Sequence, residues 1–268
     1  MTEGVHGSKD ADSVPSPAAF YDDLAPSFHR LYRDWDAAIN EQAQALDLLL
    51  GHRLGEGLHR ILDCAVGVGT QTLGLLQLGH QLWGTDISFG AVKRARSECH
   101  QRGLEAALGA ADMRMLPFPA DSFDAVICAD NAVAHLLSIP DAVRAFREMA
   151  RVARPGGVII ASVRDYEAAR RNRVPGTLPQ VNHTSGDQTI AFQVWDWLAD
   201  GRRYNLKHFS LTPRGDTWEV TTRCSTLYAF TEAELVECAQ QAGLQDIEWC
   251  APARTGFFQP VVVASVMP

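Results

Sequence analysis

The chain has 268 residues, of which 46% are hydrophobic and 21% are charged, and its formal net charge is −8. This length and composition allow a substantial core in one large domain or two small ones. The acidic balance argues against a nucleic-acid-binding or membrane-binding surface, because such surfaces need clustered Lys and Arg. The six cysteines include no Cys-x-x-Cys pair, and no apolar run is long enough to span a bilayer. We therefore predict a cytoplasmic protein without disulfides or a bound metal.

The N-terminal part of the chain divides into a polar tail and an aromatic segment. Residues 1–18 are rich in Gly, Ser, Asp and Pro, which predicts a disordered tail. Residues 19–58 are expected to form helices, with Leu24, Phe28 and Trp35 at helical spacing. Two interpretations stay open: the aromatic stripe packs on the core, or this segment is a lid whose rings line a pocket.

A glycine-broken turn follows the first expected strand. The stretch Ile61–Thr70 begins as a short apolar strand and ends in Gly67-Val68-Gly69, and residues 71–78 are then predicted to be a helix. The glycines let the backbone approach a ligand closely, and the helix N-terminus offers free N–H groups. Strands and helices alternate further along the chain, which predicts a parallel, doubly wound sheet. The later strands are expected at residues 81–86, 106–110, 122–128 and 158–163, and the helices at residues 88–102 and 139–152.

The pattern changes after Tyr166. Residues 167–187 are loop-like, and three long strands joined by short turns then predict an antiparallel meander. These strands are expected at residues 189–197, 204–212 and 218–230. A helix near residues 231–242 and two final strands complete the pattern. We predict one α/β domain, residues 19–268, with an antiparallel flap inserted at about 187–230.

Carboxylates end three successive strands of the predicted sheet. Asp63 ends the strand before the glycine turn, Asp86 ends the next strand, and Asp112 follows the third. Asp86 is placed to accept hydrogen bonds from two ribose hydroxyls, while Asp112 and the backbone N–H of Met113 suit adenine. A dehydrogenase fingerprint is incomplete because Thr72 replaces its third glycine, and no phosphate-binding Gly-Lys-Ser/Thr sequence follows the turn. This set of residues favours a cationic nucleoside ligand over a polyanionic one.

Taken jointly, these motifs resemble the class I S-adenosylmethionine-dependent methyltransferases over about residues 20–266. The residues that carry the resemblance are Leu62-Asp63-Cys64-Ala65-Val66-Gly67-Val68-Gly69, Asp86, Asp112-Met113, Leu116-Pro117-Phe118-Pro119, Phe123-Asp124 and Arg154-Pro155-Gly156-Gly157. The resemblance implies a Rossmann-like, seven-stranded, doubly wound sheet with a reversed last strand. It also implies S-adenosyl-L-methionine as methyl donor, S-adenosyl-L-homocysteine as product, and no metal. Ala65 replaces the first glycine of the usual Gly-x-Gly-x-Gly and is small enough to keep the turn.

The resemblance assigns expected contacts to the cofactor. Asp63 and Gly67 would frame its methionine end, and Asn131, after the fourth strand, would face the methionine or the substrate. The aromatic face of Tyr21 or Tyr32 can stabilise the sulfonium cation. The full set of expected cofactor contacts is Tyr21, Asp63, Ala65, Gly67, Gly69, Asp86, Ile87, Asp112, Met113 and Asn131.

The acceptor side resembles the glycine N-methyltransferase branch. The matching runs are Asp124-Ala125-Val126-Ile127-Cys128, Asn131, His135-Leu136 and Arg164-Asp165-Tyr166, with Asp165 in place of that branch's Asn. In that branch the Arg of the last run binds the substrate carboxylate, and a guanidinium fork suits a carboxylate. The expected substrate contacts are Tyr32, Asn131, Arg164 and Tyr166, and the expected catalytic residues are His135, Arg164 and Tyr21. The alternatives are a surface salt bridge for Arg164 and a packing role for His135.

We therefore expect methyl transfer to a small soluble molecule, with the amine of a small amino acid as the specific prediction. The alternative is O- or C-methylation of an aromatic or polyketide-like metabolite, because residues 116–124 resemble such enzymes too. A scaffold without catalysis is disfavoured by the intact nucleoside-binding residues. A nucleic-acid substrate is disfavoured by the net charge and by Asp130-Asn131-Ala132, which stands where an Asp/Asn-Pro-Pro-Tyr/Phe run would be expected. The oligomeric state stays open between a monomer and a homo-oligomer.

Overall fold

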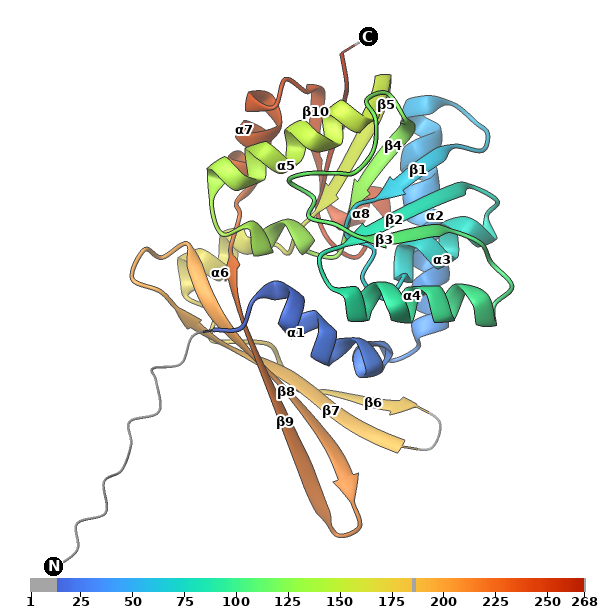
Figure 1. The fold of residues 1–268 in the computed structure, drawn as a ribbon. Coiled ribbons are helices and arrows are strands. Elements are labelled where there is room, and N and C mark those ends of the chain that lie inside the picture. Colours follow the sequence, from blue (N-terminus) through green and yellow to red (C-terminus); the bar gives the residue numbers. More distant parts are fainter. Residues whose placement is uncertain (1–13, 185–186, 268) are drawn as a thin grey trace, which may run out of the picture.

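The computed structural model describes residues 14–184 and 187–267, and a seven-stranded sheet forms its centre (Figure 1). The strands are β1 (Arg60–Asp63), β2 (Gln81–Asp86), β3 (Ala107–Ala110), β4 (Phe123–Cys128), β5 (Ala153–Ser162), β10 (Gln245–Cys250) and β11 (Val261–Ser265). Their order is β3-β2-β1-β4-β5-β11-β10, and only β11 runs antiparallel to its neighbours in this sheet. The predicted Rossmann-like sheet with one reversed strand is confirmed.

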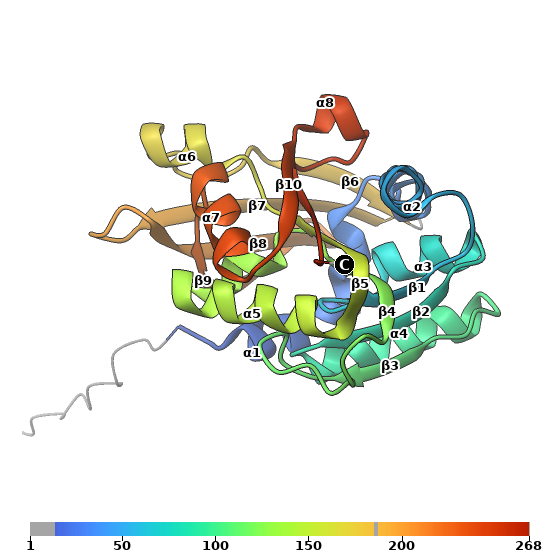
Figure 2. The ribbon, with the colours of Figure 1, turned by 90° about the horizontal axis from the view of Figure 1, so that it is seen from above.

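Helices cover both faces of the sheet (Figure 2). Helices α2 (Trp35–Leu54), α3 (Thr70–Gln77) and α4 (Phe89–Gln101) pack on one face, and α5 (Ile139–Val152) and α7 (Glu232–Gln241) pack on the other. Strand residues alternate between the two cores, since Leu62 belongs to the α5 side and Ile61 to the α2 side. Coverage on both faces explains the continuous apolar runs at residues 125–128 of β4 and 158–161 of β5. Across residues 14–184 and 187–267, no helix is both long and apolar enough to cross a membrane.

A second, antiparallel sheet is inserted between β5 and α7, and we call it the flap (Figure 1). Its strands are β6 (Gln180–Thr184), β7 (Asp187–Trp197), β8 (Arg203–Arg214) and β9 (Thr217–Tyr228). Helix α6 (Tyr166–Asn172) and β6 lie in the segment that was expected to be loop-like. Asp165 caps α6 by accepting a hydrogen bond from the N–H of Glu167, and β6 is held by pairing with β7. The inserted sheet therefore starts before residue 187, the start expected from the sequence.

The segment before α2 contains helix α1 (Pro17–Leu24) and the 3₁₀ helix η1 (Ala25–Leu31), and we call these two elements the lid. Pro26 lacks the N–H that would continue α1, so the chain tightens into η1 there. Asp34 then caps α2 by accepting a hydrogen bond from the N–H of Ala37. Of the tail expected at residues 1–18, Pro17 and Ala18 already belong to α1, and residues 1–13 lie outside the described residues.

Helix α3 packs closely on α2 at Gly74. A Cβ added there would lie 2.5 Å from both the Ala43 Cβ and the Ile39 carbonyl oxygen. We expect Gly74→Ala to lower the free energy of unfolding by about 1–3 kcal/mol, because the two helix backbones would have to separate. Urea unfolding followed by circular dichroism measures the change.

Gly51 in α2 provides the matched control, since a Cβ added there meets no atom within 4 Å. Gly51→Ala should raise the free energy of unfolding by about 0.5–1 kcal/mol through helix propensity alone. The same stabilisation in Gly74→Ala would contradict the close α2–α3 contact.

Candidate active site

The turn between β1 and α3 presents backbone N–H groups beside a buried carboxylate. Gly67 (φ 52°) and Gly69 (φ 100°) are left-handed, a conformation that glycine adopts without strain. A Cβ added at Gly67 would meet only one carbonyl oxygen, at 4.0 Å, so the turn borders open space. Asp63 is fully buried and accepts hydrogen bonds from the Thr72 hydroxyl (2.9 Å) and the Ala65 N–H (3.3 Å). These bonds tie the end of β1 to the start of α3.

Asp86 reaches the same turn from the end of β2. Its two carboxylate oxygens accept hydrogen bonds from the N–H groups of Gly67 and Ser88, each at 2.8 Å. Burial raises the pKa of Asp86, and Ile87 beside it is exposed. Asp86 therefore fixes the shape of the glycine turn as well as offering a carboxylate to a ligand.

Asp112, after β3, has a partner that the sequence did not indicate. The Arg114 guanidinium donates hydrogen bonds to both carboxylate oxygens of Asp112, at 2.6–3.1 Å, and also lies 3.4 Å from Asp141. Burial acts to raise the pKa of Asp112, but these hydrogen bonds hold it below its ordinary value. Met113 packs inward, with its sulfur 3.9 Å from the Cys128 sulfur. The roles of Asp112 and Met113 at adenine stay predictions.

The residues at this edge fit a cationic nucleoside. Carboxylates stand at the ends of β1, β2 and β3, while the basic residue among them, Arg114, is bound to Asp112. Within the described ranges no Lys or Arg forms an ion pair with Asp63 or Asp86, so a phosphate would find no basic partner there. S-adenosylmethionine carries a sulfonium and an ammonium group, and its chemistry therefore matches this set of residues.

The buried charge of Asp63 should make the cofactor-free protein sensitive to pH. Burial raises its pKa from 3.8 to about 7. The unfolded chain releases this proton at a lower pH than the folded protein does. The free energy of unfolding should therefore fall as the pH rises from about 4 to about 7. At pH 8, Asp63→Asn should raise it by about 1–3 kcal/mol, because a desolvated charge is removed.

Urea unfolding of both proteins without cofactor, at pH 5 and pH 8, measures this effect. At pH 5 the native carboxyl is already protonated, so we expect the substitution to be nearly neutral there. Equal destabilisation by Asp63→Asn at both pH values would contradict the raised pKa.

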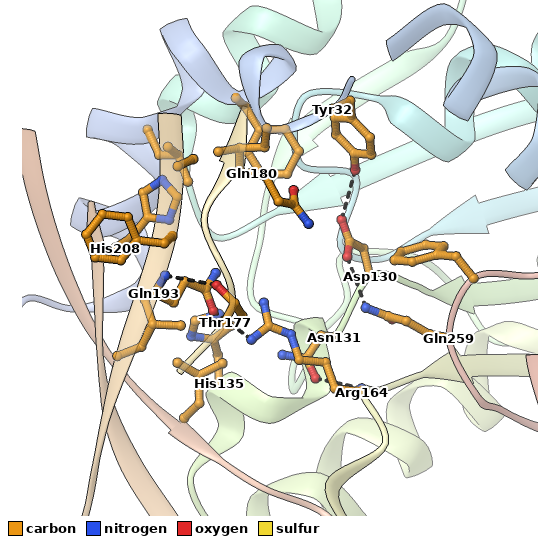
Figure 3. Close-up of a pocket in the computed structure, with 18 of the residues that line it drawn as sticks. Tyr32, Asp130, Asn131, His135, Arg164, Thr177, Gln180, Gln193, His208 and Gln259 are labelled. Atoms are coloured by element: carbon orange, nitrogen blue, oxygen red, sulfur yellow. Dashed lines mark hydrogen bonds between the residues drawn. The ribbon is translucent and has the colours of Figure 1, made fainter. Parts of the chain in front are cut away.

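A cavity of about 520 Å³ lies between the lid, the flap and the carboxyl ends of β4 and β5, and we call it the acceptor cavity (Figure 3). Apolar side chains form most of its walls: Phe20, Leu24, Phe28, Leu31, Phe192, Leu206, Leu227 and Phe258. Polar residues from the lid, the flap and the ends of sheet strands also line it: Tyr21, Tyr32, Asp130, Asn131, His135, Arg164, Gln193, His208 and Gln259. The cavity can therefore enclose an organic molecule and meet its polar groups at a few points.

Arg164 follows β5 and points into the acceptor cavity (Figure 3). Its guanidinium donates a hydrogen bond to the Gln193 side-chain oxygen (2.8 Å) and lies 5.4 Å from the Trp195 ring centre. Its backbone N–H donates to the Asn131 side-chain oxygen (3.1 Å), which fixes the end of β5 against the end of β4. In the described part of the chain no carboxylate lies within 4.0 Å of this guanidinium, so the surface salt bridge considered from the sequence is absent. A guanidinium that forms no ion pair of 4.0 Å or less with a described carboxylate thus faces the cavity, with Asp130 as a more distant negative charge.

Asp130 is a cavity residue that the sequence analysis missed. It accepts hydrogen bonds from the Tyr32 hydroxyl (3.1 Å) and the Gln259 amide (3.3 Å), and its N–H donates to the Ser162 hydroxyl (2.8 Å). Asp130 (φ 54°) and Asn131 (φ 67°) are both left-handed, which is uncommon outside glycine. The signal in the sequence was an Asp-Asn pair directly after an apolar strand, which is usually a turn.

Tyr21 and His135 form a hydrogen-bonded pair at one wall of the cavity. The Tyr21 hydroxyl lies 3.0 Å from His135 Nε2, and their rings meet edge to face at 5.2 Å. Burial, with Arg164 nearby, lowers the pKa of His135 to about 4 and burial raises the pKa of Tyr21. His135 is therefore neutral at pH 7 and is a weak proton acceptor. The catalytic roles of Tyr21 and His135 stay predictions.

Tyr166 does not reach the acceptor cavity, although it was expected to bind substrate. Its ring is buried in the core, and its hydroxyl lies 2.9 Å from the Tyr204 hydroxyl. Tyr166 begins α6, and its ring packs against Tyr204 of the flap at a centroid distance of 6.1 Å, while Arg164 and Asn131 lie near its hydroxyl. Its contact with substrate stays a prediction. The structure brings together the other three expected substrate residues, Tyr32, Asn131 and Arg164.

Comparison with known proteins bears on the first part of the chain. Residues 61–157 match the family described as "Methyltransferase domain". Glycine N-methyltransferase of Rattus norvegicus is 34% identical over 134 residues, covering 44% of this chain and 45% of that protein. Demethylmenaquinone methyltransferase of Beutenbergia cavernae is 33% identical over 148 residues, covering 52% and 57%. The chain thus spans about half the length of these curated relatives.

Among solved structures, the sugar N-methyltransferase KedS8 from Streptoalloteichus has a TM-score of 0.70 and 18% sequence identity, with 100% of this chain and 99% of that one covered. At this identity the likeness concerns the fold alone. Three observations point to the same kind of protein, a methyltransferase: the fold, the glycine turn with its strand-end carboxylates, and the match over residues 61–157. Residues 61–157 are therefore similar to a methyltransferase domain, and the chain has the fold of solved S-adenosylmethionine-dependent methyltransferases.

Proposed function

We propose that the protein transfers a methyl group from S-adenosylmethionine to the amine of a small molecule that also carries a carboxylate. The observation that carries this proposal is Arg164, whose guanidinium faces the acceptor cavity without a carboxylate partner among the described residues. A guanidinium binds a carboxylate through two parallel hydrogen bonds, which holds an amino acid in one orientation. The likeness to a glycine N-methyltransferase and to a sugar N-methyltransferase supports nitrogen as the accepting atom.

Positioning is the main task of such a site. S-adenosylmethionine, when bound, supplies an activated methyl group on a sulfonium sulfur. Arg164 and Asn131 would orient the acceptor, and the lid residues Phe20 and Tyr21 would cover it from water. Holding the acceptor in a near-attack geometry can lower the barrier by several kcal/mol, roughly 7–11 in favourable cases. Asp63 and Asp86 would hold the cofactor on the other side.

The size and apolar walls of the acceptor cavity suit an acceptor larger than glycine. A volume of about 520 Å³ lies in the range of pockets that enclose drug-sized ligands. The apolar walls from the lid and flap, including Phe28, Phe192 and Phe258, would surround an apolar body. An amino acid with a bulky apolar side chain satisfies both the walls and Arg164. We also infer a cytoplasmic enzyme that acts on small molecules rather than nucleic acid, in keeping with the net charge of −8.

A second candidate is O- or C-methylation of an aromatic or polyketide-like metabolite. The same apolar walls favour it, as does the likeness to a demethylmenaquinone methyltransferase. Such an acceptor would leave Arg164 without a carboxylate to bind.

Methyl transfer from isotope-labelled S-adenosylmethionine to a panel of acceptors separates the two candidates. The panel holds amino acids from glycine to tryptophan, their decarboxylated amines, and phenols without an amine. We expect transfer to amino acids with apolar side chains, and little transfer to the decarboxylated amines. Transfer confined to phenols would overturn the proposal and establish the second candidate.

A further inference from the structure

Two groups of opposite charge, Arg164 and Asp130, face the acceptor cavity, and among the described residues neither forms an ion pair of 4.0 Å or less, although each lies in the other's electrostatic field. Arg164 donates only to Gln193 among side chains, and Asp130 accepts only from Tyr32 and Gln259. No ion pair of 4.0 Å or less joins Asp130 to Arg164 or to any other described cation, although both line the same space (Figure 3). A partly buried charge without a counter-ion is costly unless a ligand supplies one.

We propose that Asp130 binds the ammonium group of the acceptor and takes its proton, while Arg164 binds the acceptor's carboxylate. The acceptor is then a zwitterion that spans the two residues. This inference rests on the proposed N-methylation and deepens it, because it assigns the amine pole of the acceptor to one side chain.

The elements around Asp130 hold its carboxylate in place. Tyr32, at the end of η1, and Gln259, before β11, each donate to it, and its own N–H is bound to Ser162 on β5. Two segments far apart in sequence therefore hold the Asp130 side chain at the carboxyl end of β4, and a third, β5, holds its backbone. The left-handed backbone at Asp130 and Asn131 turns the chain sharply here, and such conformations cluster at functional sites.

The proton has a balanced route. The ammonium gives one proton to the Asp130 carboxylate, which becomes neutral, and the amine keeps its lone pair. That lone pair forms the new N–CH3 bond while the S–CH3 bond breaks, with the electron pair of the broken bond left on sulfur. Asp130 then releases its proton to water, so one proton is produced for each methyl group transferred.

Asp130 is better suited to this step than His135. Burial raises the pKa of Asp130 to about 6, whereas burial and Arg164 lower that of His135 to about 4. A proton acceptor works best when its pKa lies near the working pH. The charged and titratable groups that face Asp130 are Arg164 after β5, Tyr32 at the end of η1 and Tyr21 on α1. Both tyrosines keep their protons at neutral pH, since burial raises their pKa.

Calorimetric titration tests the assignment without needing turnover. The probes are L-phenylalanine, 3-phenylpropanoate, which lacks the amine, and phenethylamine, which lacks the carboxylate. Each is titrated into protein saturated with S-adenosylhomocysteine. We expect L-phenylalanine to bind at least about tenfold more tightly than either single-pole probe, because each charged hydrogen bond contributes about 1.5–3 kcal/mol.

In Asp130→Asn, L-phenylalanine should lose about tenfold or more in affinity and approach 3-phenylpropanoate. Binding of 3-phenylpropanoate and of S-adenosylhomocysteine should not change. Asp121→Asn is the matched control, since Asp121 (φ 57°) shares the left-handed backbone and is exposed away from the cavity. The pH profile of kcat/KM should also lose its lower limb near pH 6 in Asp130→Asn and keep it in the control.

Three results would overturn the inference. Unchanged L-phenylalanine affinity in Asp130→Asn would remove Asp130 from the acceptor site, and no preference for the zwitterion in the wild type would reject the two-pole arrangement. Weaker S-adenosylhomocysteine binding in Asp130→Asn would instead assign Asp130 to the ammonium of the cofactor. None of these results bears on the proposed N-methylation, which the acceptor panel tests on its own. Labelled methyl on the amines of the panel supports N-methylation, and its absence from them overturns N-methylation.

Discussion

Replacing Arg164 with Met should raise the KM for a carboxylate-bearing acceptor by about 30- to 1,000-fold, equivalent to about 2–4 kcal/mol. The guanidinium faces the acceptor cavity and has no competing carboxylate among the described residues, so its loss leaves the acceptor's charge unpaired. Met keeps much of the packing volume against Trp195 and Gln193, and the variant should fold. Steady-state kinetics with the best acceptor of the panel measures the change.

Arg170→Met is the control for this substitution. Arg170 lies on α6 close in sequence to Arg164, but it pairs with Glu234 at 2.6 Å and does not line the acceptor cavity. Its KM for the acceptor should match the wild type, and S-adenosylmethionine affinity should be unaltered in both variants. Normal acceptor kinetics in Arg164→Met would remove Arg164 from substrate binding.

Asp86→Ala should weaken S-adenosylmethionine binding by about 1–3 kcal/mol, or roughly 5- to 150-fold. Two effects add. The variant loses the carboxylate expected to hold the ribose hydroxyls, and it frees the N–H of Gly67, which Asp86 now fixes at 2.8 Å. Asp86→Asn retains one acceptor oxygen and should fall between the wild type and Asp86→Ala. Isothermal titration calorimetry measures all three affinities directly.

Asp124 provides the comparison for Asp86. It lies near the amino end of β4, away from the carboxyl ends of the strands where Asp86 lies, and its carboxylate forms an ion pair with Arg154 at 2.6 Å. Asp124→Asn should leave cofactor affinity unchanged. If Asp86→Ala also bound the cofactor with wild-type affinity, the assignment of Asp86 to the ribose would be wrong.

The cofactor side could be predicted from the sequence because its residues belong to short, contiguous motifs. Asp63, the glycine turn and Asp86 each follow an apolar strand, and parallel strands bring their carboxyl ends to one edge. The seven-stranded sheet and its reversed last strand, β11, followed from the family resemblance and are confirmed. The sequence did not show that the Asp86 carboxylate accepts a hydrogen bond from the glycine turn itself, or that Arg114 donates hydrogen bonds to Asp112.

The acceptor side could be predicted only in part, since it is assembled from segments far apart in the chain. Gln193 on the flap, Gln259 before β11 and Asp130 after β4 carry no local motif, and only the tertiary contacts bring them together. Arg164 was found because the family resemblance marked it. Tyr166, two residues later, is buried in the core and does not line the acceptor cavity, so its predicted contact with substrate is not brought out by the structure.

The most direct test of this account compares the best amino-acid acceptor with its carboxamide, which keeps the amine and the side chain but loses the negative charge. The measurement is the ratio of kcat/KM for methyl transfer to the two compounds, in the wild type and in Arg164→Met. We predict a ratio of at least about 30 in favour of the acid in the wild type, falling close to one in the variant. Equal rates for acid and carboxamide in the wild type would contradict the proposal that Arg164 selects a carboxylate-bearing amine.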